Sequence, residues 1–167
     1  SLNPSIRDTR QEARDTFEKM ALPETKAEEY RHTPITRLLQ KNFSLETTSA
    51  TSSDLDQQEF FIPSLEGNVI VLINGIFSTT HSKIVSPAEE VQISNLSDAL
   101  AGGNNLASKH FAKYSDYKTD SLTAWNTAAW EHGVFVNVPP ATQVKKPILI
   151  YNIHDTRAGQ VITASRN

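Results

Sequence analysis

The chain has 167 residues, of which 16 are basic and 19 acidic, giving a formal net charge of −3 at pH 7. These charges are interspersed without a basic run, which disfavours nucleic-acid binding. No cysteine is present, so disulfides, thiolate-bound metals and thiol nucleophiles are excluded within this chain. Neither a signal-peptide core nor a bilayer-length apolar run is visible, and we therefore expect a cytoplasmic protein without membrane contact.

Two helices are predicted in the N-terminal segment, residues 1–43. Asn3 followed by Pro4 is typical of a helix start, because the Asn side chain can cap the first turn and proline fits the first helical position. A narrow apolar stripe follows, so this helix is expected to lie on the body of the protein rather than inside it. A second, short helix is expected after Thr33, which precedes Pro34 and is suited to cap it.

A linker and a β-rich body are predicted next. The linker is placed at residues 44–58, because seven of its first ten residues are Ser or Thr and no periodic apolar pattern is present. The body, residues 59–167, contains an apolar run that is interrupted by Asn74 and Gly75. Two apolar strands around Asn-Gly are the strongest short-range indication of a β-hairpin.

A helix followed by two strands is predicted to form the core of this body. Asp120 is placed to cap the start of the helix, and Gly133 is placed to end it. Helical spacing puts Leu122, Trp125 and Ala129 on one apolar face, which we expect to face the core.

The two strands after this helix are strongly apolar. In the first, Val134, Val136 and Val138 lie on one side and Phe135 on the other. The second, Ile148–Ile153, is apolar on both sides except for one Asn, and such strands require cover on two faces. The predicted fold class is therefore α+β, with N-terminal helices followed by a small mixed β-sheet with short helices.

The five histidines give little support for a catalytic role, and no two of them have the spacing of a metal-binding pair. His154 and Asp155 could act as a base and its orienter only if the strand has ended, because adjacent side chains of a strand point to opposite faces. His132 is expected at a helix C-terminus, where capping is the simpler explanation. A small hydrolase or transferase that uses His154 or His132 remains the alternative function.

The segment between the two N-terminal helices is unusually rich in interaction-prone side chains. A charged joint is ordinarily solvated, and its ion pairs contribute little. Tyrosine and arginine, however, are residue types that anchor protein interfaces. The candidate docking residues are therefore Glu28, Glu29, Tyr30, Arg31, Thr33 and Pro34.

This segment resembles the SufB/SufD family of scaffold proteins for iron–sulphur cluster assembly, in particular its SufD branch. The family pattern has Arg-x-x-Ala-x-x-x-Phe in the first helix, then Leu-Pro, then Lys-x-Glu-(Glu/Asp)-(Trp/Tyr)-Arg-(Tyr/His)-Thr-Pro. Further likenesses are the Asn-Gly hairpin and the helix-to-strand core. The matching residues are Arg10, Ala13, Phe17, Leu22, Pro23, Lys26, Glu28, Glu29, Tyr30, Arg31, His32, Thr33, Pro34, Asn74, Gly75, Asn126, Ala128, Gly133, Val138, Pro139, Pro147, Arg166 and Asn167.

The resemblance implies an N-terminal region that precedes a right-handed parallel β-helix, whose first strands would begin near the end of this chain. It also implies SufB-like and SufC-like partner proteins, with iron–sulphur clusters built on the full complex. The family residues proposed to handle iron or sulphur lie beyond Asn167, so no cofactor is expected in this fragment and no enzymatic activity. Partner binding is expected to require the chain after Asn167, and Val161–Ala164 is expected to form an exposed or partner-paired sheet edge.

Overall fold

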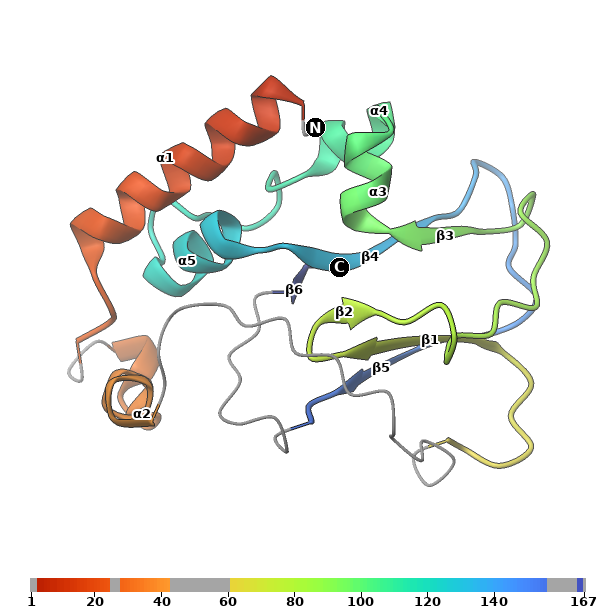
Figure 1. Cartoon of the computed structure of the whole chain (residues 1–167), viewed down its shortest axis with the longest axis horizontal. Coiled ribbons are helices and arrows are strands. Elements are labelled where there is room, and N and C mark those ends of the chain that lie inside the picture. Colours follow the sequence, from red (N-terminus) through yellow and green to blue (C-terminus); the bar gives the residue numbers. More distant parts are fainter. Residues whose placement is uncertain (1–2, 25–27, 43–60, 156–164, 167) are drawn as a thin grey trace.

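The computed structural model describes residues 3–24, 28–42, 61–155 and 165–166. Helices cover one side of two small stacked β-sheets in this part of the chain, so the predicted α+β class is confirmed (Figure 1). The helices are α1 (Pro4–Met20), the 3-10 helix η1 (Glu28–Tyr30), α2 (Ile35–Asn42), α3 (Leu96–Ala101), α4 (Asn105–His110) and α5 (Ser121–Ala129). The strands are β1 (Asn68–Ile73), β2 (Ile76–Phe77), β3 (Gln92–Asn95), β4 (His132–Asn137), β5 (Ile148–Ile153) and β6 (Ser165–Arg166).

The first sheet has the order β2-β1-β5 and contains the predicted hairpin. β1 and β2 pair antiparallel, with Ile73 opposite Ile76. The two turn residues between them, Asn74 and Gly75, have φ angles of 48° and 81°. A two-residue hairpin turn requires this left-handed backbone, which Asn and Gly adopt at little cost, and the hairpin prediction is confirmed.

β5 joins this sheet by pairing parallel to β1 along its whole length. At the start of the pairing, a Cβ atom on Gly67 would come within 2.9 Å of both the Pro147 carbonyl oxygen and a Leu149 methyl group. Glycine therefore permits the close approach of the two strands. Cover on both faces of β5 was expected but is incomplete, since Ile150 remains 39% exposed. β5 ends the described sheet order, so only β1 shields it within the sheet plane.

The second sheet has the order β3-β4-β6 and lies between the first sheet and the helices (Figure 1). Val134 of β4 packs toward the first sheet against Ile70 and Leu72. Phe135, on the opposite side of β4, packs against the helical cluster that contains Trp130. The predicted alternation along this strand is therefore confirmed.

Helix α5 begins as predicted but ends earlier. The Asp120 side chain accepts a hydrogen bond from the Thr123 amide at 2.6 Å, which confirms the N-cap. The helix ends at Ala129 rather than near Gly133, which lies inside β4. Trp130 leaves the helix in an extended conformation and is only 1% exposed. Burial of this large ring determines the helix end more strongly than a glycine three residues later.

The face of α5 that packs inward is made of small side chains. Ala124 and Ala128 are buried there, and the structure places Ala13 of α1 fully inside the same contact region between α1 and α5. Small side chains allow two helix backbones to approach closely. The predicted apolar face is instead only half-buried at Leu122 and Trp125.

Three predictions fall outside the described residues or beyond this chain. The linker at 44–58 and the sheet edge at Val161–Ala164 lie outside the described residues. Next to that predicted edge, β6 pairs parallel to β4, with His132 opposite Ser165. The β-helix stays a prediction.

Candidate interaction site

The candidate docking segment forms a compact joint between α1 and α2. Its first residues make the 3-10 helix η1. A turn follows, in which the Thr33 amide donates to the Tyr30 carbonyl at 2.9 Å and the Ile35 amide donates to the Thr33 carbonyl at 2.7 Å. Pro34 comes directly before α2, where a residue with fixed φ and no N–H is well tolerated.

Tyr30 connects this joint to the body of the protein. Its side chain is half-buried, and its hydroxyl donates to Oδ2 of Asp120 at 2.8 Å. The other oxygen of the same carboxylate caps α5 by accepting from the Thr123 amide. One carboxylate therefore holds both the joint and the start of a core helix, although Tyr30 and Asp120 are 90 residues apart.

The Asp120 carboxylate has a lowered pKa. Burial acts to raise the pKa of Asp120, but hydrogen bonds from Thr123 and Tyr30 outweigh burial and keep it below its ordinary value of 3.8. The ionised form is the better acceptor for both donors. Asp120 therefore stabilises this connection above pH 4, and the stabilisation is lost as pH falls through the lowered pKa.

The remaining candidate residues face solvent or are described only by their backbone. Glu28 and Arg31 form an ion pair at 3.7 Å, with side chains 85% and 64% exposed. Such an exposed pair contributes about 0 to 1 kcal/mol. Thr33 and Pro34 are exposed as well, and Glu29 is placed as a backbone residue of η1. The joint thus divides into one anchoring residue, Tyr30, and a solvent-facing remainder.

The family-pattern residues of α1 also serve the fold. Nε of Arg10 donates to the Ala128 carbonyl at 3.1 Å, and its guanidinium lies 5.5 Å from the centre of the Trp130 ring. Burial lowers the pKa of Arg10, while nearby Glu131 acts to raise it. Arg10 therefore joins α1 to the end of α5 by a hydrogen bond and a cation–π contact.

The asparagine of the hairpin has a second structural use besides the turn. Oδ1 of Asn74 accepts from the Asp155 amide at 2.8 Å, and the Asn74 amide donates to the Ile153 carbonyl at 2.8 Å. Asn74 is 3% exposed, so these bonds satisfy polar groups that would be costly to bury alone. The Asn-Gly pair therefore both turns the hairpin and fastens the end of β5.

Comparison with known protein families identifies the family of this chain. A family model described as the SufBD protein N-terminal region matches residues 2–150. The chain belongs to the SufB/SufD family. Members of this family take part in iron–sulphur cluster assembly by the SUF system, and the resemblance expected from the sequence is confirmed at this level. No individual curated protein matches the chain. In the described part of the chain, no helix combines the length and the hydrophobicity that crossing a bilayer requires.

The two histidines of the alternative enzyme hypothesis do not form a site in this SufB/SufD-family fold. His132 was expected to cap a helix, but it is the first residue of β4, and its Nδ1 is enclosed without a hydrogen-bond partner in the described part of the chain. β5 ends at Ile153, so the strand has ended before His154 and Asp155, as a base and its orienter would require; His154 is nevertheless exposed whereas Asp155 is 5% exposed, so the two side chains lie in different surroundings. Among the described residues, no group of three His, Asp or Glu side chains is placed to hold a metal ion.

A third histidine, which no sequence motif singles out among the five, contacts a hydroxyl. Nδ1 of His81 and Oγ of Ser78 are 2.8 Å apart. In the same turn, Oγ of Ser82 donates to the Ser78 carbonyl at 2.6 Å and accepts from the Val71 amide at 2.9 Å. These bonds organise the chain that leaves the hairpin, and the spacing of three residues is that of a local turn.

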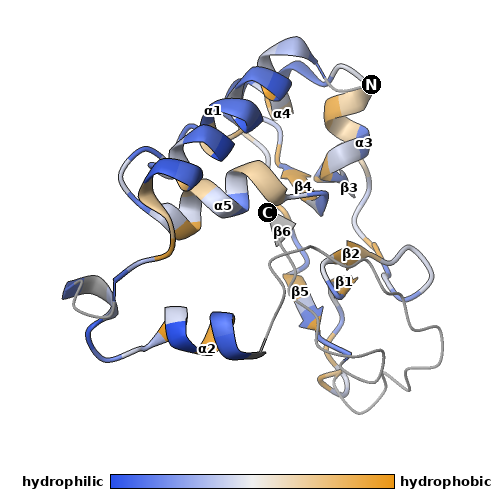
Figure 2. Ribbon diagram, turned by 60° about the vertical axis from the view of Figure 1, so that its left-hand side comes forward, coloured by the Kyte–Doolittle hydropathy of each residue, from blue (hydrophilic) through white to orange (hydrophobic). Residues whose placement is uncertain are grey.

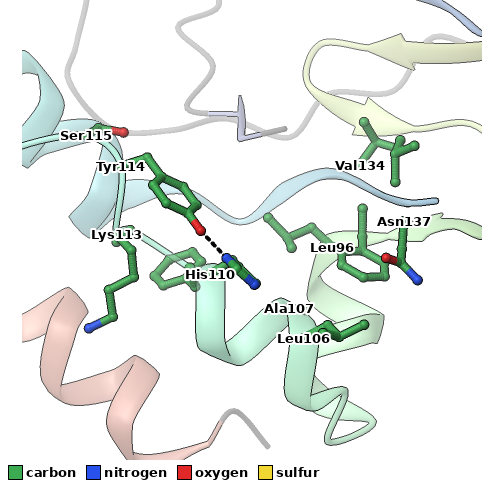
Figure 3. Close-up of a pocket in the computed structure, with 13 residues that line it drawn as sticks. Leu96, Leu106, Ala107, His110, Lys113, Tyr114, Ser115, Val134 and Asn137 are labelled. Atoms are coloured by element: carbon green, nitrogen blue, oxygen red, sulfur yellow. Dashed lines mark hydrogen bonds between the residues drawn. The ribbon is translucent and has the colours of Figure 1, made fainter. Parts of the chain in front are cut away.

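A groove of about 350 Å³ lies between α4, the loop after it and β4 (Figure 3). His110 and Tyr114 form its polar side, with the ring of His110 hydrogen-bonded to the Tyr114 hydroxyl. Phe111 and Val134 form part of the apolar wall of the groove. The sequence indicated no groove here, because its walls come from elements that are remote in sequence.

Proposed function

We propose that this chain is the N-terminal region of a SufD-like scaffold subunit of the SUF complex. Its role is to contact other proteins of the complex, without catalysis of its own, in the cytoplasm. The observation that carries this proposal is the family match over residues 2–150, taken together with the use of the pattern residues in internal packing.

The contacts that the distinctive residues make disfavour a catalytic role. Arg10 is bonded to a helix end, Tyr30 to a helix cap and Asn74 to a neighbouring strand. Residues that serve a reaction instead converge on a shared cavity with a nucleophile or a base in reach. The pattern residues of this chain are spread over three separate contacts, which favours an architectural role.

SufB-like and SufC-like proteins are the partners that the proposal names. Clusters would be assembled on the complete complex, and this region would hold no cofactor of its own. A chain of net charge −3 without cysteine agrees with such a role, since thiolates are the usual protein ligands of iron–sulphur clusters.

The proposal is tested by reconstitution with SufB and SufC proteins from the organism that encodes the chain. The full gene product should form a complex with them in size-exclusion chromatography with light scattering. The 167-residue chain by itself should carry no stoichiometric iron or sulphide after anaerobic reconstitution. Cluster binding by the 167-residue chain alone would contradict the proposal.

A competition experiment separates a SufD-like from a SufB-like role. The gene product is offered an equimolar mixture of SufB and SufD, each with a distinguishable tag. A SufD-like subunit should pair with SufB in preference to SufD. The reverse preference would keep the family assignment and assign the chain to the SufB branch instead.

A further inference from the structure

Helix α2 lies at the periphery of the described part of the chain. None of its side chains from Ile35 to Lys41 is buried, and Leu38 is 51% exposed. In both views α2 lies to one side of the sheets, beyond the lower end of α1 (Figures 1 and 2). The side chains of interest, which we call the α2 surface, are Ile35, Arg37, Leu38, Leu39 and Lys41.

The α2 surface is amphipathic in the way that docking helices are. Ile35, Leu38 and Leu39 follow the i, i+3, i+4 spacing that places side chains on one helical face. A helix of eight residues is marginal in water without tertiary contacts to its apolar face. Helices that insert into a hydrophobic groove of another protein present anchors at this spacing.

The position of α2 is fixed although Leu38 on its apolar face is exposed and Ile35 and Leu39 are only half-buried. Oγ1 of Thr36 donates to the Pro23 carbonyl at 2.5 Å, which holds α2 to the segment after α1. Just before α2, Tyr30 is bonded to Asp120 of the body. A docking element that is held in place before binding loses less entropy when the partner arrives.

The charge of the segment identifies the chemistry of the partner. Helix α2 contains two basic side chains, Arg37 and Lys41, and no acidic one. The rest of the chain, with 14 basic and 19 acidic residues, has a net charge of −5. A local positive surface on an acidic protein favours a partner with a complementary acidic rim.

A second copy of this chain is the poorer occupant. Two grooves of the described part of the chain, of about 350 and 320 Å³, are lined by no acidic residue. The larger one includes Lys113, which repels Arg37 and Lys41. Complementarity is therefore better supplied by a different protein.

We propose that the α2 surface inserts Leu38 into an apolar, acid-rimmed groove on a partner subunit of the cluster-assembly complex. This inference rests on the proposed function, which provides the partner. It adds the side of the molecule that makes the contact and the chemistry of the surface that receives it.

The test measures affinity for SufB and SufC proteins by isothermal titration, with the full gene product and its variants. Leu38→Asp should raise Kd about tenfold or more, as loss of a central anchor does. The double variant R37E/K41E should raise Kd about tenfold at low salt and less at high salt, because rim charges are screened. Neither change should alter the melting temperature, since α2 buries none of these side chains.

Matched controls come from α4, which also exposes a leucine and a lysine. Leu106 is 46% exposed and Lys109 is exposed, so Leu106→Asp and Lys109→Glu repeat the same chemistry elsewhere. Both controls should bind like the unchanged protein. If they weaken binding as much as the α2 variants, the effect is not specific to α2 and the inference is overturned.

The other possible results of the binding experiment also bear on the inference. If the unchanged protein binds a partner and the α2 variants bind equally well, the inference fails and the proposed function stands. If the unchanged protein binds neither partner, both fail. A homodimer that Leu38→Asp dissolves, or binding to anionic phosphatidylserine vesicles that R37E/K41E abolishes, would assign the α2 surface to another occupant and overturn the inference.

Discussion

Helices α1 and α2 belong to the same N-terminal segment, yet only α1 is built into the protein. Ile6 and Ala13 of α1 are buried against the body, whereas α2 buries none of its side chains from Ile35 to Lys41. The family match over residues 2–150 covers both helices. A family match therefore does not separate residues that hold a fold from residues available to a partner. Burial and bonding do separate them.

The largest expected effect lies where α1 meets the core. Trp130 is 1% exposed, with the Phe111 ring 5.0 Å away and Arg10 above it. Trp130→Ala should lower the free energy of unfolding by about 3 to 5 kcal/mol, because it leaves a large cavity. Urea denaturation followed by circular dichroism measures this. Trp125→Ala is the control, and its half-buried side chain should cost clearly less. Equal losses would remove the distinction between core and periphery.

The next effect concerns the attachment of α1. Arg10→Met keeps much of the packing but removes the bond to the Ala128 carbonyl and the charge over Trp130. We expect a loss of about 2 kcal/mol, as for hydrogen bonds with a charged donor. Arg14→Met, an exposed change on the same helix, should be close to neutral by the same denaturation measurement. A neutral Arg10 variant would show that α1 is held by apolar packing alone.

The bond between joint and body should contribute less. Tyr30→Phe removes one hydrogen bond to a partly exposed carboxylate, and a loss of about 1 kcal/mol is expected at pH 7. Because the pKa of Asp120 is lowered, the deficit should shrink as pH falls below 4 and the carboxylate becomes protonated. Denaturation at pH 7 and pH 3 tests both points. A deficit that is independent of pH would mean that the Tyr30 hydroxyl contributes without its bond to the ionised Asp120 carboxylate, and no deficit at either pH would mean that Tyr30 acts by packing.

The smallest effect is expected on the solvent-facing side of the joint. Glu28→Gln breaks the exposed ion pair with Arg31 and should change the free energy of unfolding by less than about 0.5 kcal/mol. In 1 M NaCl the difference should be smaller still, because salt screens an exposed ion pair. A loss above 1 kcal/mol would place Glu28 with the structural residues.

Features that depend on neighbouring residues were predictable from the sequence. The caps at Asn3 and Asp120 and the hairpin at Asn74 are each decided within a few residues, and all three are present. The end of α5 was predicted wrongly, because burial of Trp130 is a tertiary effect that overrides the local glycine preference.

The organisation of the joint could not be predicted from local patterns. Tyr30 and Arg31 were treated as equivalent docking candidates, since both residue types are common in interfaces. Only the fold distinguishes them, because the acceptor for Tyr30 is a helix cap 90 residues later. The exposure of Leu38 could not be predicted either, because an amphipathic pattern is the same whether or not another element covers the apolar face.

The contact between Arg10 and Ala128 also has a consequence for synthesis on the ribosome. The two residues are 118 positions apart. At a translation rate of about 5 to 20 residues per second, α1 is made about 6 to 24 seconds before the helix it docks on. During that interval Ile6 and Phe17 have no core to enter. Nascent chains should therefore remain protease-sensitive in α1 until α5 has emerged.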